Sequence, residues 1–276
     1  MEDKGIVLFA FGKRGYAFAA YNLAYSIKHL CNLNVTLVCD KHTRDRIPNV
    51  FDNIIILEAG EYKNETRVDP AKVKTNMYGY LPYKHNLYLD VDAVMTKDIN
   101  PFMDKLIEQD KFYLTDVIDS GGYDDTISYS IWASNEDVWD RFELDKSATL
   151  PAVQSSWAYI RKDESSKSFF NQVKEEYDKG FSKDKLTMHW GGTLPDELFY
   201  SAVCAKNALV PKIDERPIFF GNNYSELTDR EICEKYYLLA IYGNGKGRTL
   251  TKYRYCLLYT SPSPRDATLS RMPSSA

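Results

Sequence analysis

Short apolar runs alternate with amphipathic or polar segments in the N-terminal part of the chain. The run at residues 5–11 ends at Gly12, and residues 16–30 then repeat apolar positions at the three- to four-residue spacing of a helix. The remaining apolar runs predict buried strands at residues 34–39, 53–57 and 86–89. Buried strands that alternate with helices indicate an α/β protein whose central sheet is mostly parallel and flanked by helices.

A helix is expected between the third and fourth of these strands. Asp69 is a favourable N-cap, and Pro70 is suited to the first helical position. We expect the helix to run to about Tyr80, because Pro82 follows closely.

The second half of the chain continues the pattern with strands and helices. Residues 111–115 and 156–160 predict strands, and residues 164–177 predict a helix with one apolar side. Pro195 begins another predicted helix, the spacing of Thr228 and Glu231 is that of a capping box, and residues 237–242 predict a last strand.

The domain organisation follows from the absence of a linker or internal repeat before residue 257. We expect residues 1–256 to form a single Rossmann-like domain. Residues 257–276 are rich in Ser and Pro and lack apolar periodicity. This string resembles the translated sequencing-adapter sequence that ends many reading frames from environmental assemblies, so we expect a non-native or disordered tail and a C-terminally truncated domain.

Composition excludes several classes of protein. The chain has 276 residues, 35 Lys and Arg against 39 Asp and Glu, and a net charge of −4, so nucleic acid is not expected as its main partner. No apolar run reaches the ~20 residues of a transmembrane segment, and the apolar segment that follows residues 1–4 is too short for a signal peptide. The five cysteines form no CxxC or Cys/His cluster. We therefore expect a cytoplasmic protein.

The candidate chemistry lies at the end of the strand at residues 86–89. Asp90 and Asp92 stand two residues apart directly after it, so in an extended backbone both side chains point to the same side. A divalent cation offsets their repulsion, and hard oxygen ligands suit Mn²⁺ or Mg²⁺. Ligands of open α/β sheets bind at this end of the strands. The other interpretation is a solvated turn after the strand.

The segment at residues 74–99 resembles the glycogenin-like enzymes of glycosyltransferase family eight, which are retaining enzymes with a GT-A fold. A basic residue, here Lys74, precedes the Asp-x-Asp strand at the family's spacing. Weaker similarities are Gly15-Tyr16 with the following helix, residues 154–160, and Gly191-Gly192 followed by Pro195-Asp196-Glu197. The resemblance extends over roughly residues 5–250.

The resemblance implies a donor site for a nucleoside-diphosphate sugar. Asp90 and Asp92 would hold Mn²⁺ (or Mg²⁺) on the diphosphate, and Lys74 would add a second cation there. Tyr16 and Val91 would contact the nucleotide. These roles predict transfer of a hexose, from UDP-glucose or UDP-galactose, to a hydroxyl of a glycan, lipid or protein acceptor, with retention at the anomeric carbon.

The sugar side of the implied site departs from the family pattern. Asp196, Glu197 and Gln154 are the catalytic candidates and would orient the sugar, but Gln154 stands in the place of Asn and Glu197 in the place of Gln. The family's C-terminal segment with a His metal ligand is matched only in spacing, at residues 242–248. These departures leave an inactive nucleotide-sugar or glycan-binding protein as one alternative. A nucleotidyltransferase is the other, although residues 12–15 are a poor match to its Gly-rich loop.

Overall fold

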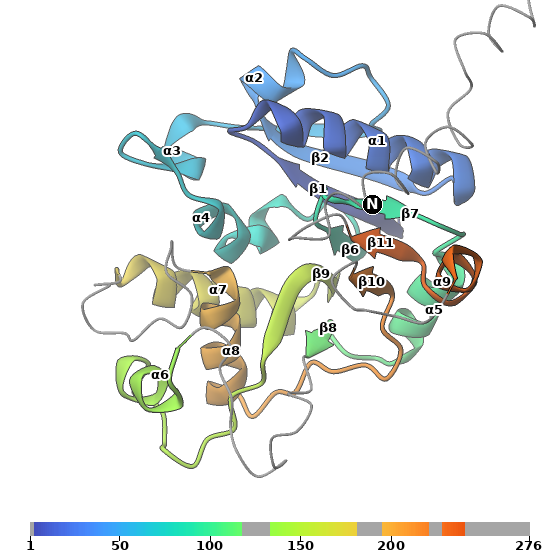
Figure 1. Ribbon diagram of the computed structural model, residues 1–276. Coiled ribbons are helices and arrows are strands. Elements are labelled where there is room, and N and C mark those ends of the chain that lie inside the picture. Colours follow the sequence, from blue (N-terminus) through green and yellow to red (C-terminus); the bar gives the residue numbers. More distant parts are fainter. Residues whose placement is uncertain (1–2, 118–132, 181–194, 221–227, 241–276) are drawn as a thin grey trace, which may run out of the picture.

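A six-stranded central sheet organises the computed structural model, which describes residues 3–117, 133–180, 195–220 and 228–240. Its strands are β1 (Lys4–Ala10), β2 (Asn34–Asp40), β3 (Asn53–Leu57), β6 (His85–Leu89), β8 (Tyr113–Val117) and β9 (Val153–Arg161). Their order is β3-β2-β1-β6-β9-β8 (Figure 1). The first four of these are parallel, and β9 is antiparallel to both of its neighbours. The predicted α/β fold with a mostly parallel sheet is confirmed.

Two smaller sheets accompany the central one within the described residues. One has the order β10-β11-β7, and the other is a two-stranded hairpin of β4 and β5. Their strands are β4 (Lys63–Asn64), β5 (Arg67–Val68), β7 (Ala93–Met95), β10 (Ile218–Phe220) and β11 (Leu238–Ala240). Strand β11 lies inside the predicted strand at residues 237–242, whereas the sequence pattern did not predict β4, β5, β7 or β10.

Helices cover both faces of the central sheet (Figure 1). They are α1 (Arg14–Leu30), α2 (Lys41–Arg44), α3 (Ala59–Tyr62), α4 (Pro70–Thr75), α5 (Asn100–Glu108), α6 (Asn135–Arg141), α7 (Glu164–Asp178), α8 (Asp196–Lys206) and α9 (Asp229–Lys235), with the 3₁₀ turn η1 (Met77–Tyr80). The predicted helices at 16–30 and 164–177 correspond to α1 and α7, while α5 and α6 were not predicted.

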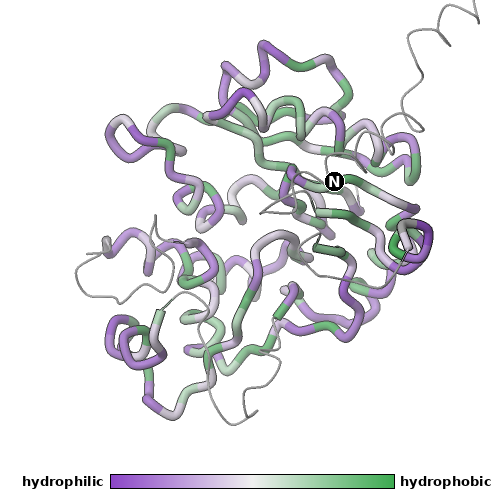
Figure 2. The backbone as a smooth tube through the Cα atoms, in the orientation of Figure 1, coloured by the Kyte–Doolittle hydropathy of each residue, from purple (hydrophilic) through white to green (hydrophobic). Residues whose placement is uncertain are grey.

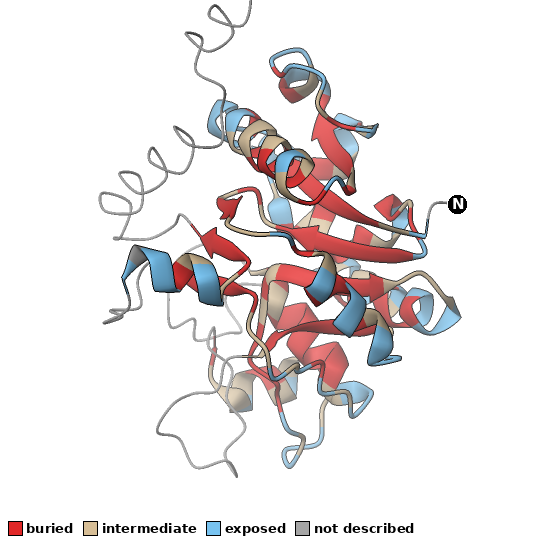
Figure 3. Ribbon diagram, turned by 90° about the vertical axis from the view of Figure 1, so that its right-hand side faces the viewer, coloured by how far each residue is buried: buried red, intermediate tan, exposed pale blue. Residues whose placement is uncertain are grey.

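The core has two parts, one on each face of the sheet. On β1, Ile6 and Leu8 pack with α1, α5 and the three-stranded sheet β10-β11-β7. Val7 and Phe9 point the other way and pack with α4, α7 and α8. This alternation follows from the two-residue period of a strand. Figure 2 shows the central strands as largely hydrophobic, and Figure 3 shows them buried beneath helices whose outer sides are exposed.

The predicted helix at residues 69–80 forms in two pieces. Asp69 is the N-cap as expected, and its carboxylate accepts hydrogen bonds from the backbone N–H groups of Ala71 and Lys72. The α-helix ends at Thr75, and η1 continues the chain after Asn76. Asn and Gly have low helix propensity, and Gly79 follows within the same turn. The single long helix was therefore wrong in its second half.

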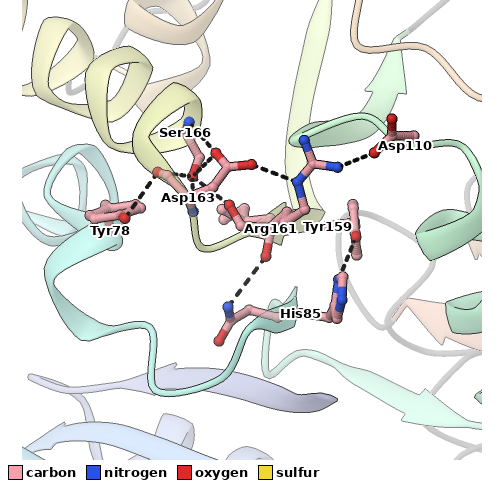
Figure 4. Close-up of polar contacts among 9 residues, drawn as sticks. Tyr78, His85, Asp110, Tyr159, Arg161, Asp163 and Ser166 are labelled. Carbon is pink, nitrogen blue, oxygen red and sulfur yellow. Dashed lines mark hydrogen bonds and ion pairs between the residues drawn. The ribbon is translucent and has the colours of Figure 1, made fainter. Parts of the chain in front are cut away.

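Polar side chains surround the paired strands β6 and β9 at the end remote from Asp90. His85 Nδ1 lies 2.7 Å from the hydroxyl of Tyr159, and Arg161 pairs with Asp110 and Asp163 (Figure 4). In this register His85 faces Arg161 and Leu89 faces Trp157. The residues after Leu89 are thereby placed beside the beginning of β9.

Some expectations concern parts of the chain outside the described residues. These are the tail at 257–276, the Gly191-Gly192 pair and the segment 242–248. Strand β9 begins three residues before the predicted strand at 156, at Val153, and β8 is shifted to Tyr113–Val117. Among the described helices none is long and apolar enough to cross a membrane.

Candidate functional site

The candidate site lies at the edge of the sheet where the parallel strands end, which we call the carboxyl edge. Strand β1 ends there at Ala10, β2 at Asp40 and β6 at Leu89. The antiparallel β9 begins at the same edge, and the backbone N–H of Asp90 donates to the carbonyl of Ser156 at 2.8 Å. The register therefore brings the Asp-x-Asp segment next to Gln154 and its neighbours.

Lys74 is the centre of a charged cluster at this edge. Its ammonium lies 2.9 Å from Oδ1 of Asp90 and 3.8 Å from Oδ2 of Asp196. It also donates to the hydroxyl of Ser155 at 3.2 Å. We call these four residues the Lys74 cluster. They come from α4, the end of β6, the start of β9 and the first turn of α8, so four separate elements meet at one ammonium group.

The environment of Lys74 keeps it positively charged. Its side chain is only 14% exposed, and burial alone lowers the pKa of an ammonium group. The carboxylates of Asp196 and Asp90 outweigh burial and raise the pKa of Lys74 well above its usual value. Since Tyr200 donates its hydroxyl proton to the carbonyl of Lys74 at 2.7 Å, α8 also fixes the backbone of this residue.

Asp90 is held by a second donor besides Lys74. The hydroxyl of Tyr88, two residues earlier on β6, donates to Oδ1 of Asp90, the same oxygen that Lys74 contacts. The Lys74 ammonium lies 5.5 Å from the centre of the Tyr88 ring. The contacts from Lys74 and Tyr88 fix the orientation of the Asp90 carboxylate, and both are made to its Oδ1 atom.

The first turn of α8 carries two acidic groups, Asp196 of the Lys74 cluster and its neighbour Glu197. Burial raises the pKa of Asp196, although the charge of Lys74 opposes the shift. Burial, and then the charge of Asp196, raise the pKa of Glu197 to about 8. A carboxyl group with this pKa is mostly protonated at pH 7, so it can donate a hydrogen bond as well as accept one.

Three buried polar atoms at the carboxyl edge have no hydrogen-bond partner among the described residues, although one of them, on Asp196, lies 3.8 Å from the Lys74 ammonium. They are Oε1 of Gln154, Oγ of Ser156 and Oδ2 of Asp196. Buried polar atoms are nearly always hydrogen-bonded, and an orphaned one costs about 1–3 kcal/mol. Three such atoms gathered at one edge indicate a place where a polar ligand supplies the missing partners.

The residues after β6 could supply some of the ligands of a divalent cation. Asp90 and Asp92 are both partly buried and supply hard carboxylate oxygens. In the part of the chain that the structure describes, no three His, Cys, Asp or Glu side chains come together as a metal site. Mg²⁺ and Mn²⁺ are commonly held by one or two carboxylates plus the phosphates of a substrate. The donor set fits a cation that arrives with a diphosphate.

The other two predicted donor contacts, Tyr16 and Val91, are not members of the Lys74 cluster. Tyr16 is in the first turn of α1, just beyond the end of β1, and its ring is 40% exposed with Lys13 Nζ 5.9 Å from its centre. The side chain of Val91 is 6% exposed and belongs to the core on the α1 face. A ligand would meet Val91 through its backbone.

Sequence reasoning missed several residues of the site. Tyr88 could have been found, because residues two apart on a strand point to the same side and Asp90 was already a candidate. Nothing in the sequence connects Ser155 or Tyr200 with Lys74, since the tertiary structure alone brings them together. Asp116, at the end of β8, pairs with Arg216 at 3.0 Å.

Comparison with known proteins identifies the fold. No protein-family model and no curated protein sequence matches the chain. Among solved structures, galactosyltransferase LgtC, in complex with donor and acceptor sugar analogues, matches with a TM-score of 0.53 and 13% identity over 87% of each chain. The apo structure of the bifunctional glycosyltransferase WbbM matches with a TM-score of 0.53 and 10% identity, over 88% of this chain and 46% of WbbM.

Proposed function

Because the chain has the GT-A fold of these glycosyltransferases, we propose that it is a metal-dependent glycosyltransferase that uses a nucleoside-diphosphate sugar. The observation that carries the proposal is the Lys74 cluster beside orphaned polar atoms at the carboxyl edge. The donor is UDP-glucose or UDP-galactose, and the hexose moves to a hydroxyl of a glycan, lipid or protein acceptor with retention at the anomeric carbon.

Charge at the diphosphate is the main requirement of this reaction. The leaving group gains negative charge as the glycosidic bond breaks, and fixed positive charge beside it lowers the barrier. Asp90 and Asp92 would hold Mn²⁺ or Mg²⁺, which supplies Lewis-acid stabilisation of the diphosphate when bound. Lys74 contributes a cation that remains protonated because neighbouring carboxylates raise its pKa.

The sugar would be oriented by Gln154, at the start of β9, and by Asp196 and Glu197, in the first turn of α8. Oε1 of Gln154 has no hydrogen-bond partner among the described residues, and the Asp196 carboxylate has acceptor capacity beyond its ion pair with Lys74, so both can accept hydrogen bonds from sugar hydroxyl groups. The raised pKa of Glu197 favours its protonated form, which can donate a hydrogen bond where the family pattern has the amide of Gln. The departure at Glu197 therefore changes the side-chain charge less than the residue type suggests.

An inactive nucleotide-sugar binding protein is the second candidate. The observation that favours it is the direct contact of Lys74 with Asp90, because an ammonium on that carboxylate competes with a metal ion. A nucleotidyltransferase is disfavoured. Strand β1 ends at Ala10 and α1 begins at Arg14, which leaves too few residues for the longer Gly-rich phosphate loop that this class needs after its first strand.

Donor turnover by the full chain tests the proposal. Nucleotide release would be measured for a panel of nucleotide sugars with Mn²⁺, with and without chelator, for the wild type, Asp92→Ala and the surface control Asp104→Ala. We expect release from one uridine-linked donor that is lost with chelator and in Asp92→Ala, but kept in Asp104→Ala.

The negative outcomes separate the candidates. Metal-dependent nucleotide binding without release, measured by calorimetry, would support the inactive binding protein. Absence of nucleotide binding in the folded wild type would contradict both candidates. The product's anomeric configuration, read by NMR after an acceptor is found, tests retention.

A further inference from the structure

Strand β9 carries a β-bulge at the point where it meets the candidate site. Along β8, Thr115 pairs with Ala158 and the next residue, Asp116, pairs with Gln154. Ser155, Ser156 and Trp157 therefore fall between two consecutive positions of β8, while Trp157 keeps its pairing with Leu89 on the other side. Bulges of this kind bend a strand and redirect its side chains, and they are frequent beside active sites.

The hydroxyl of Thr115 closes this bulge. Its Oγ1 lies 2.7 Å from the carbonyl oxygen of Gln154, the residue just before the bulged segment, and 2.5 Å from that of Trp157, the last residue of the segment. The backbone N–H of Thr115 donates elsewhere, to the carbonyl of Pro211 at 2.8 Å. Since Thr115 is fully buried, water cannot replace its hydroxyl.

The bulged segment carries side chains that the proposed function uses. Ser155 accepts a hydrogen bond from Lys74, and Gln154 and Ser156 contribute two of the three orphaned polar atoms. A regular strand would pair these residues with β8 and turn alternate side chains toward opposite faces of the sheet. The bulge instead keeps these consecutive residues at the carboxyl edge.

We propose that Thr115 is a positioning residue of the donor-sugar site, which acts through the bulge that its hydroxyl holds closed. The proposal rests on the proposed function, because the segment it positions is the one assigned to the sugar. Thr115 itself contacts neither the diphosphate nor the sugar. Its loss is therefore expected to affect the orientation of the sugar more than the affinity for the nucleotide.

The test replaces Thr115 by Val, which keeps the shape and removes the hydroxyl. We expect kcat for donor turnover to fall about 10- to 100-fold, since small misplacements of substrate-orienting groups have effects of this size. The KM for the donor is expected to change much less. Thr115→Ser restores the hydroxyl and is expected to recover most of kcat, which a merely structural role of the methyl group would not produce.

Thr36→Val is the matched control. Thr36 is also fully buried in the central sheet, and its hydroxyl lies 2.8 Å from that of Tyr83, away from the carboxyl edge. We expect a comparable loss of stability without a change in kcat. Equal kcat in Thr115→Val and wild type, or equal losses in Thr115→Val and Thr36→Val, would overturn the proposal.

Hydrogen exchange separates this proposal from the proposed function. Thr115→Val is expected to accelerate amide exchange in peptides covering residues 153–158 and to leave β1 and β2 unchanged. If the wild type turns over no donor, the proposed function fails. The exchange measurement then still tests whether the hydroxyl of Thr115 holds the bulge. Unchanged exchange at 153–158 would then show that Thr115 does not hold the bulge.

Discussion

Removal of the Lys74 charge is the perturbation whose size follows most directly from the structure. Lys74→Met keeps the length of the side chain and leaves Asp90 and Asp196 without their ammonium partner. Breaking a buried ion pair by removing one partner costs about 3–5 kcal/mol. The Asp196 side chain is 12% exposed, but that of Asp90 is 31% exposed and partly screened by solvent, so we expect the lower end, about 3 kcal/mol at pH 7.5.

The loss is expected to depend on pH in a defined direction. Burial raises the pKa of Asp196 while Lys74 lowers it, so Lys74→Met raises this pKa further. A carboxyl group whose pKa is higher in the folded protein binds a proton that the unfolded chain releases, and its contribution to stability decreases as pH rises through the folded pKa. The loss of unfolding free energy in Lys74→Met, relative to the wild type, should therefore be smaller at pH 5 than at pH 7.5.

Urea unfolding, followed by tryptophan fluorescence in metal-free buffer, measures both effects. Lys72→Met is the matched control, because Lys72 lies on the same helix and, among the described residues, its ammonium donates to the carbonyl of Lys63 and the side-chain oxygen of Asn64 but pairs with no carboxylate. We expect a change of about 1 kcal/mol or less for this control. Equal losses in the two variants, or a Lys74→Met deficit that is independent of pH, would refute the reasoning.

Two further predictions concern Glu197 and Gly12. Burial and the charge of Asp196 raise the pKa of Glu197 to about 8, so the stability of the protein should decline as pH rises toward and through 8. Thermal unfolding at pH 6 and pH 9 should show a smaller decline for Glu197→Gln than for the wild type. Equal declines in the two proteins would contradict this prediction. Gly12 has φ +81°, and a Cβ there would lie 2.9 Å from Val68, so Gly12→Ala should lose about 1–2 kcal/mol in urea unfolding. Adding Val68→Ala should recover only part of that loss, because the backbone strain remains.

Local chemistry explains which elements the sequence could predict. The strands β1, β2 and β6 are apolar runs buried on both faces, and β3 is a short apolar run at the edge of the sheet, so their position can be recognised without knowledge of their neighbours. Asp69 and Thr228 cap their helices through backbone groups only three residues away or less. The short strands β7 and β10 lack such a signal, because they exist only through pairing with β11.

The candidate site divides in the same way. The sequence by itself determined the positions of the first four strands along the chain, the placement of Asp90 and Asp92 directly after the fourth of them, and the start of the helix that carries Lys74. It could not show that Lys74 contacts Ser155 and Asp196, which lie 81 and 122 positions further along the chain. Only the antiparallel pairing of β9, its bulge and the docking of α8 decide those contacts. They depend on long-range packing, which no local pattern of hydrophobic and polar residues encodes.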